Sequence, residues 1–442
     1  MIGKNIPEKL THLYVVVMLF VFPLFTGPEG YILLTEKKYI FFVLCTLLWS
    51  GTVVVWRFAI QRKNAFKSHL VPDMLVFSAV IAVFISTFSS KQVNIISVET
   101  GRCDGLLTYL LYGCIMLGVF HYGTACRGYL YILAGSYTLM CTISLLQLFG
   151  YNPFGLYPNN LCYQDPVIQE ISPFLGTLGN IDVFSAMHCL VLPLLFSELI
   201  YGKNRNRWIL ILSVLTGILC VYGIRVASGI LALFLTGLLF IAGVLLEYHP
   251  VGWTERTTRL FIVVFMTGSI LVCLLCVYIG TWDSQTMREL QQILRGECMD
   301  TFGSNRIRIW KHTWKIVCKN PIFGIGADNL GTEIDLVFQR YSSVLEEWLV
   351  NGVDNAHNEY LHYLVSFGIV GTVPIAILLI LTYSGLIKKY MNSETVRYLA
   401  PSFICYSIQA FFNVGLCIVT PVFLIAWSFL LKSLYFKNPD YD

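Results

Sequence analysis

Charged residues are scarce in this sequence. Asp, Glu, Lys and Arg make up 13% of the 442 residues, whereas hydrophobic residues make up 56%. Soluble domains carry roughly 25% charged residues, so this composition excludes an ordinary soluble protein and indicates an integral membrane protein. The net charge is only +4, and no nucleic-acid partner is expected from it.

Several chemical motifs are missing from the sequence as well. The 14 cysteines are scattered, and no pair of Cys-x-x-Cys motifs with metal-ligand spacing is present. There is no phosphate-binding loop, no Ser-His-Asp set with recognisable local sequence and no metal-binding His/carboxylate motif. We therefore expect neither a metal nor a cofactor. Some cysteines fall in predicted loops, where disulfide pairing is an open alternative: Cys103, Cys162, Cys298 and Cys318.

Long apolar segments predict an all-α fold, a polytopic transmembrane helical bundle. A helix needs about 20 residues to cross a bilayer core, and about twelve segments approach that length: 12–28, 37–56, 71–88, 105–121, 128–149, 180–200, 208–224, 228–247, 259–280, 358–387, 396–413 and 417–436. The first of them lacks the small-residue cleavage site of a signal peptide, so we expect it to be a span.

Basic residues indicate the orientation of the bundle. With the N-terminus inside, the short inner loops hold Arg57, Arg62, Lys63, Lys67, Arg127, Lys203, Arg205, Arg207, Arg256, Arg259, Lys388, Lys389 and Arg397. The short outer loops hold only Lys37, Lys38, Lys91, Arg102 and Arg225. Because Lys and Arg concentrate in cytoplasmic loops, both termini are expected in the cytoplasm and the long loop 281–357 outside.

Three regions follow from this topology. Residues 1–280 are expected to hold nine spans, and residues 358–442 three spans and a cytoplasmic tail. Residues 281–357 contain tryptophans and helical stripes. These features favour an extracytoplasmic subdomain that caps the membrane, and they argue against a disordered linker. The sequence shows no inverted pair of broken helices, which argues against a secondary transporter.

The stretch 303–360 is the longest polar break in the chain. Its apolar residues recur at helical spacing, at Ile307, Trp310, Trp314 and Val317. Basic residues are interleaved with them: Arg306, Arg308, Lys311, Lys315 and Lys319. The pattern predicts an amphipathic basic helix that ends at Asn320-Pro321 and is followed by a flexible turn at 324–326.

His357 is the candidate general base. We expect Asn355 to cap the re-entering helix and His357 to lie in its first turn, where the helix N-terminus disfavours an imidazolium. Asn358 and Glu359 could orient the ring. A structural role is the alternative for a histidine at an interface, and His312 and His362 are secondary candidates.

Arginines are the candidate anion-binding groups. Arg306 could act as a guanidinium fork for a diphosphate or contact lipid phosphates, and Arg308 is the weaker candidate on the same helix. Arg225, at the junction of two spans, could clamp an anion or simply extend to the interface.

Further polar residues lie at the outer ends of two spans. Arg102 and Asp104 lie between Gly101 and Gly105, and they could pair with each other or contribute to a donor site. Asp182, in the sixth span, could reach the outer cavity, whereas His188 is expected to be a core histidine.

Four stretches carry a resemblance to a known family: Arg-Ile-Arg-Ile-Trp at 306–310, Asn-Pro-Ile-Phe-Gly-Ile-Gly at 320–326, Ala-His-Asn-Glu-Tyr-Leu at 356–361 and Gly-Ile-Val-Gly at 368–371. With these motifs the chain resembles the O-antigen ligase and O-antigen polymerase superfamily of bacterial envelope glycosyltransferases. Ile224-Arg225 departs from the Ser-Arg that is usual in the family. The Gly-Asn-rich stretch 175–180 also resembles the family's entry to a middle span.

The resemblance implies transfer of a glycan from an undecaprenyl-diphosphate carrier to an acceptor hydroxyl, on the outer side of a bacterial cytoplasmic membrane. Arg225 and Arg306 would hold the diphosphate and His357 would act as base, in a metal-independent inverting reaction. The acceptor would be a glycan or a lipid. The alternatives are a polysaccharide polymerase of the same family, an exporter or flippase of lipid-linked sugar, and a non-catalytic scaffold.

Overall fold

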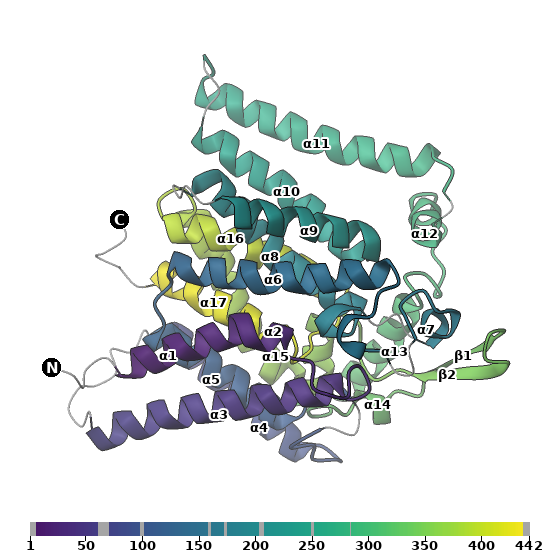
Figure 1. Cartoon of the computed structure of the whole chain (residues 1–442), viewed down its shortest axis with the longest axis horizontal. Helices are drawn as coiled ribbons and strands as arrows, with labels where there is room; N and C mark the ends of the chain where they lie inside the picture. Colours follow the sequence, from purple (N-terminus) through teal and green to yellow (C-terminus); the bar gives the residue numbers. More distant parts are fainter. Residues whose placement is uncertain are drawn as a thin grey trace.

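The computed structural model describes residues 6–435 apart from 61–69, 98–100, 158–160, 172–174, 203–206, 249–251 and 283. Helices dominate the described part of the chain (Figure 1). In the first half they are α1 (Ile6–Val16), the π-helix η1 (Val17–Val21), α2 (Phe22–Leu24), α3 (Leu34–Ile60), α4 (Leu70–Ser89), α5 (Leu106–Tyr122), α6 (Arg127–Leu148), η2 (Pro153–Gly155), α7 (Pro166–Ile171), η4 (Gly176–Leu178) and α8 (Ile181–Tyr201).

The second half adds nine helices and a hairpin to the described structure. They are α9 (Trp208–Ile224), α10 (Ala227–Glu247), α11 (Glu255–Ile279), α12 (Gln285–Leu294), α13 (Arg306–Lys319), α14 (Leu330–Glu333), β1 (Val337–Ser342), β2 (Glu347–Gly352), α15 (Glu359–Lys389), α16 (Glu394–Ala410) and α17 (Thr420–Tyr435). Strands β1 and β2 pair antiparallel, with Val337 opposite Gly352. This hairpin was not anticipated in the segment 281–357.

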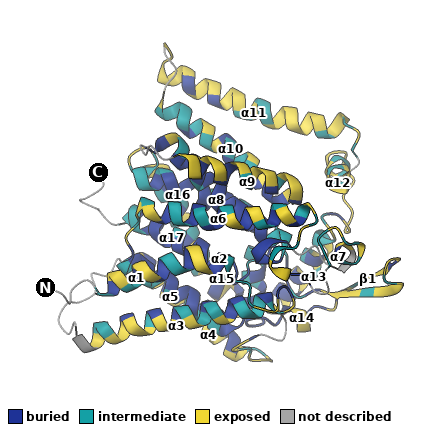
Figure 2. Cartoon of the chain, viewed as in Figure 1, coloured by how far each residue is buried: buried dark blue, intermediate teal, exposed yellow. Residues whose placement is uncertain are grey.

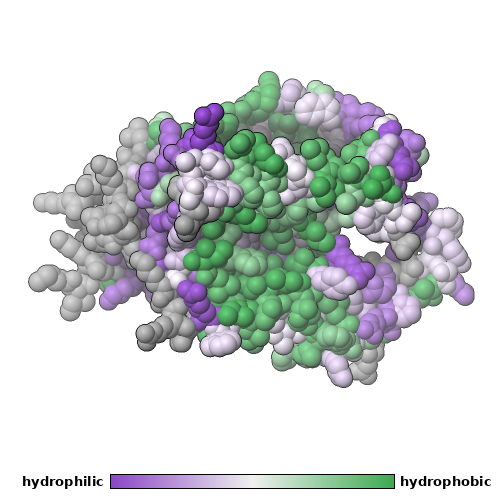
Figure 3. Space-filling view, turned by 90° about the horizontal axis from the view of Figure 1, so that it is seen from above, coloured by the Kyte–Doolittle hydropathy of each residue, from purple (hydrophilic) through white to green (hydrophobic). Residues whose placement is uncertain are grey.

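Each predicted apolar segment coincides with a helix. Eight helices in the described ranges are long and apolar enough to cross a membrane, and three more are apolar but shorter, at Leu106–Tyr122, Trp208–Ile224 and Thr420–Tyr435. The chain is therefore a polytopic helical membrane protein, and twelve spans remain a prediction. Seen from the α11 side, hydrophobic side chains cover the middle of the molecule, and hydrophilic ones gather toward its ends (Figure 3).

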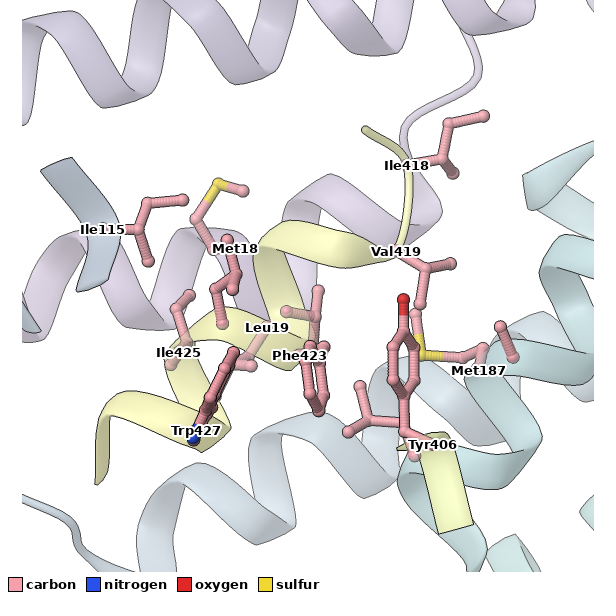
Figure 4. Close-up of a cluster of buried hydrophobic side chains, with 14 of the residues drawn as sticks. Met18, Leu19, Ile115, Met187, Tyr406, Ile418, Val419, Phe423, Ile425 and Trp427 are labelled. Atoms are coloured by element: carbon pink, nitrogen blue, oxygen red, sulfur yellow. The ribbon is translucent and has the colours of Figure 1, made fainter. Parts of the chain in front are cut away.

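The core lies around α8, α16 and α17. Most of α8 is buried, whereas α11 lies at the edge of the bundle and is exposed along most of its length (Figures 1 and 2). Aromatic and sulfur-containing side chains fill the centre, and the Tyr406 and Phe423 rings stack 4.0 Å apart (Figure 4). Such close packing of rings stabilises helix contacts where lipid offers no hydrophobic driving force.

Residues 281–357 lie at one end of the bundle, which we call the loop end (Figure 1). Helix α13 has its predicted extent and ends at Asn320. Its predicted apolar stripe is only partly correct, because Ile309, Ile316 and Val317 are buried while Trp314 is 55% exposed. The helix lies between a small hydrophobic cluster on one side and a groove on the other, so both of its faces are apolar.

Helix α15 is broken at Gly368, where φ is 60° and ψ is −164°. In an unbroken helix, the amides of Ile369 and Val370 would donate to the carbonyls of Val365 and Ser366, and the break prevents both of these hydrogen bonds. Residues 321–326 supply new partners for these groups: the amides of Ile369 and Val370 donate to the carbonyls of Pro321 and Ile322 at 2.9 and 3.2 Å. In return, the carbonyls of Val365 and Ser366 accept from the amides of Ile325 and Gly326, at 3.0 and 2.8 Å.

This arrangement corrects one expectation and adds a feature that was not predicted. The turn at 324–326 is not flexible, because its backbone is hydrogen-bonded into the break of α15 and Ile325 is buried. A broken helix is also present, although the sequence around Gly368 shows only an apolar run. Gly368 and Gly324 both have positive φ, and a Cβ on either would collide with the backbone of the other segment.

Candidate functional site

The beginnings of α13 and α15 meet at the loop end. The Trp310 indole Nε1, on α13, donates to the Ala356 carbonyl at 2.9 Å, and Ala356 is fully buried. Arg306 lies one turn before Trp310, where its charge acts on the His357 ring. The structure therefore brings Arg306 and His357 together, although about fifty residues separate them in the sequence.

His357 occupies a strained turn just outside α15. Asn358, and not Asn355, is the N-cap, since its Oδ1 accepts from the Leu361 amide at 3.0 Å. Asn355 Oδ1 instead accepts from the His357 amide at 2.9 Å, and His357 has a left-handed φ of 49°. A non-glycine residue in this conformation stores strain, which is common at functional sites. Asn358 is thus occupied with capping the helix.

The His357 imidazole is held uncharged. Burial, followed by the positive charges of Arg306 and Arg102, lowers the pKa of His357 to about 4. Its Nδ1 is buried and has no hydrogen-bond partner among the described residues. At neutral pH the ring can therefore accept a proton, as a general base must.

Arg102 is fixed in place by Asp354. Its Nε and Nη2 donate to the two carboxylate oxygens at 2.8 and 2.7 Å, which is the bidentate geometry that favours arginine. Burial alone would raise the pKa of Asp354, but the bond to Arg102 lowers it below its usual value. Arg102 thus pairs with Asp354 and not with Asp104, which lies against His362 instead.

The loop before α5 is tied to the segment that precedes the hairpin. The Asn94 side-chain amide donates to the Asp328 carbonyl and to Asn329 Oδ1, at 3.1 and 2.8 Å. Asn329 Nδ2 in turn donates to the Gln92 carbonyl at 2.8 Å. These bonds hold the loop that carries Arg102 next to the residues that precede His357.

Arg306 is half-buried and only weakly held by the protein. Its Nη1 lies 3.4 Å from the Gly303 carbonyl, and its Nε is buried with no partner among the described residues. Asp182, at the start of α8, also lies within electrostatic reach of Arg306 and Arg102. A guanidinium with an unsatisfied buried donor is well suited to bind an anion.

An apolar groove with a basic edge lies beside the site. It lies between α13 and α15 and is open to solvent, with a volume of about 1600 Å³ that includes part of this open space. Aromatic residues, among them Trp310, Trp314 and Phe411, line it together with basic side chains of α13: Arg308, Lys311, His312 and Lys315. Arg308 also lies over the Phe338 ring of the hairpin, with its Cζ 5.8 Å from the ring centre. The groove suits a molecule with an apolar part and an anionic part.

Arg225 lies at the junction of α9 and α10. It is the C-cap of α9 with a φ of 54°, and it is exposed. Its Nε lies 3.3 Å from the Tyr222 carbonyl, and its Cζ lies 5.2 Å from the centre of the Tyr222 ring. A role for Arg225 in binding the diphosphate therefore stays a prediction.

Sequence reasoning missed Asp354 and underrated His362 and Glu359. Glu359 and His362 are three residues apart in a helix, and therefore share a face, within a segment predicted to enter the membrane. Ionisable residues in such a segment are a signal of function that could have identified both. Asp354 had no comparable signal, because its arginine partner lies 252 residues away.

The described residues include no group of three or more His, Cys, Asp or Glu side chains placed to hold a metal. All four cysteines in the predicted outer loops are free thiols.

Comparison with known proteins finds a family that part of the chain resembles. The family model described as O-antigen ligase matches residues 212–376, from α9 into α15, and this range contains Arg306, His357 and the break at Gly368. None of the curated proteins matches the chain. The family implies a membrane glycosyltransferase of the ligase or polymerase type, which acts on a lipid-linked glycan and an acceptor. Over residues 212–376, the chain is similar to the O-antigen ligase superfamily.

Proposed function

We propose that the protein transfers a glycan from an undecaprenyl-diphosphate carrier to an acceptor hydroxyl at the extracytoplasmic face of the cytoplasmic membrane. The observation that carries this proposal is the uncharged, half-buried imidazole of His357 within electrostatic reach of Arg306 and Arg102. Residues 281–357 would cap the reaction site as one unit. Lys and Arg in the predicted inner loops support an outer location for this end.

The reaction follows from these groups. Arg306 would bind the diphosphate, whose departure needs neutralisation of charge but no covalent intermediate. His357 would take the proton of the acceptor hydroxyl while the oxygen attacks the anomeric carbon. The new C–O bond forms as the bond to the diphosphate breaks, so the anomeric configuration inverts. The apolar groove beside Trp310 would receive the lipid part of a substrate.

A polymerase would use the same donor site and base, and differs only in its acceptor. An exporter would instead place polar groups near the membrane midplane, in broken helices that line a cavity. The break in α15 is filled by residues 321–326, and the groups that surround His357 lie at the loop end. This arrangement favours the transferase.

Arg306→Ala should lower the transfer rate by about 10²–10³-fold, because one group that stabilises the leaving charge is lost. Release of undecaprenyl diphosphate from a labelled donor, by purified protein in nanodiscs, measures the rate. Arg295→Ala is the matched control, since Arg295 lies over Tyr278 at the end of α12. Arg225→Ala in the same assay tests whether that residue belongs to the clamp. Full activity of Arg306→Ala would remove the clamp from the proposal.

The pH dependence should differ between the free enzyme and the complex. With a pKa of about 4, His357 is half protonated near pH 4 and mostly neutral well above it, so kcat/KM should fall as the pH drops through 4 and not through 6.5. A bound diphosphate offsets the charges of Arg306 and Arg102 and raises the pKa of His357, so kcat should fall at a higher pH. Identical midpoints in the two profiles would contradict this electrostatic account.

A further inference from the structure

A second set of ionisable side chains lies beside His357. Asp104 stands two residues before α5, and His362 lies in the first turn of α15. Each residue is only 5% exposed. Such residues are costly to bury where a helix enters a membrane, and they are more often functional than structural.

Asp104 and His362 lie next to one another in the lining of a small cavity. His362 Nε2 lies 3.4 Å from Asp104 Oδ2. The cavity has room for about one water molecule. Its other ionisable lining groups are Tyr109, Tyr112, Glu359 and Tyr363.

Several polar atoms of these side chains lack hydrogen-bond partners, which is not expected of a purely structural pair. Neither ring nitrogen of His362 has a hydrogen-bond partner among the described residues, and the same holds for His357 Nδ1. Each unsatisfied buried polar group costs about 1–3 kcal/mol, so stability alone does not account for this arrangement. The two imidazoles are also close enough to influence one another electrostatically.

The surrounding charges differ on the two sides. Next to His357 lie the cations Arg306 and Arg102, the latter paired with Asp354. Next to His362 lies the Asp104 carboxylate, with the Glu359 carboxyl, which accepts from the Tyr406 hydroxyl at 3.2 Å, in the same cavity. The other titratable groups that face this cavity or interact electrostatically with Asp104 are Arg102, Tyr39, Tyr109, Tyr112, Tyr363, Cys103 and Cys417. A proton that moves from His357 toward His362 therefore leaves two cations and approaches a carboxylate.

We propose that Asp104 and His362 form a buried proton site that receives the proton His357 takes from the acceptor. This inference rests on the proposed function. In the step, the acceptor O–H bond breaks and a proton binds one ring nitrogen of His357. The proton on Nδ1 then passes through water to His362, which becomes an imidazolium beside the Asp104 carboxylate. His357 is again neutral, and the proton later leaves to solvent. Asp104 and His362 are thus positioning residues that act through His357.

His362→Gln tests the proposal, because glutamine can hydrogen-bond but cannot carry a proton at neutral pH. We expect kcat to fall at least tenfold while the affinity for a fluorescent undecaprenyl-diphosphate glycan stays unchanged. The solvent deuterium isotope effect on kcat should rise, because proton release from His357 then limits the rate. Asp104→Asn, which is nearly isosteric, should shift the pH midpoint of kcat, since it removes the carboxylate beside His362.

His12→Gln is the matched control. His12 bonds the Tyr129 hydroxyl at 2.7 Å in another part of the bundle, and its variant should keep the kinetics of the wild type. A merely structural role would lower thermal stability, donor affinity and kcat together, with an unchanged isotope effect and pH midpoint, and would overturn the proton site. Wild-type kinetics in both His362→Gln and Asp104→Asn would also overturn the proton site, but would not contradict the proposed transferase function. Absence of transfer by the wild type would overturn both proposals.

Discussion

Replacing His357 with glutamine should slow glycan transfer by about 10²–10⁴-fold, the usual contribution of a general base. The glutamine side chain can still donate hydrogen bonds but cannot accept the proton of the acceptor hydroxyl. Donor binding should survive, because Arg306 lies on a different helix and does not depend on the imidazole. Single-turnover release of undecaprenyl diphosphate, measured alongside equilibrium binding of the donor, separates the two effects.

His357→Asn is a useful companion variant, since asparagine tolerates the left-handed conformation that residue 357 adopts. If both variants lose turnover and keep donor affinity, the loss comes from proton transfer and not from strain in the turn. Full turnover in either would assign the base to another residue. Asp182, within electrostatic reach of Arg306, would be the next to test.

Gly368→Ala should destabilise the protein by at least ~3 kcal/mol, the upper end of the cost of a sparsely allowed backbone conformation. The φ and ψ at residue 368 are accessible almost only to glycine, and a Cβ would collide with the Ile322 carbonyl oxygen. The collision would displace residues 321–326 and leave two pairs of backbone groups without partners. The midpoint of thermal unfolding in detergent, followed by size-exclusion chromatography, measures the loss.

Gly237→Ala is the matched control for this substitution. Gly237 lies within α10, and a Cβ there would meet open space. Alanine at a helical position of this kind is expected to be neutral or stabilising by up to ~1 kcal/mol. Equal unfolding midpoints for the Gly368 and Gly237 variants would show that the break in α15 does not depend on glycine.

The parts of the fold that could be predicted from the sequence are those with a local signal. Apolar runs located every long helix to within a few residues, and the pattern from Arg306 to Asn320 gave the extent of α13. The pattern did not reveal that α13 has apolar neighbours on two sides, because the spacing of apolar residues in a sequence indicates a single apolar face of a helix.

The remaining features depend on partners that are distant in the sequence. Gly368 reads as an ordinary glycine in an apolar helix, and only the docking of residues 321–326 shows why the helix breaks there. Asn355 and Asn358 are equally good caps by composition, and the backbone decides between them. The prediction for Arg225 came from its position at the junction of two spans, and its contact with Tyr222 had no signal in the sequence.

The junction between α13 and α15 also has a mechanical consequence. The Trp310–Ala356 bond and the backbone bonds around Gly368 join the two helices at both ends of the 320–357 segment. Bilayers of different thickness tilt spanning helices through hydrophobic mismatch. Because the guanidinium of Arg306 and the imidazole of His357 belong to one braced unit, such tilting would move them together. The distance between these two groups should therefore not change with the lipid composition of the surrounding membrane.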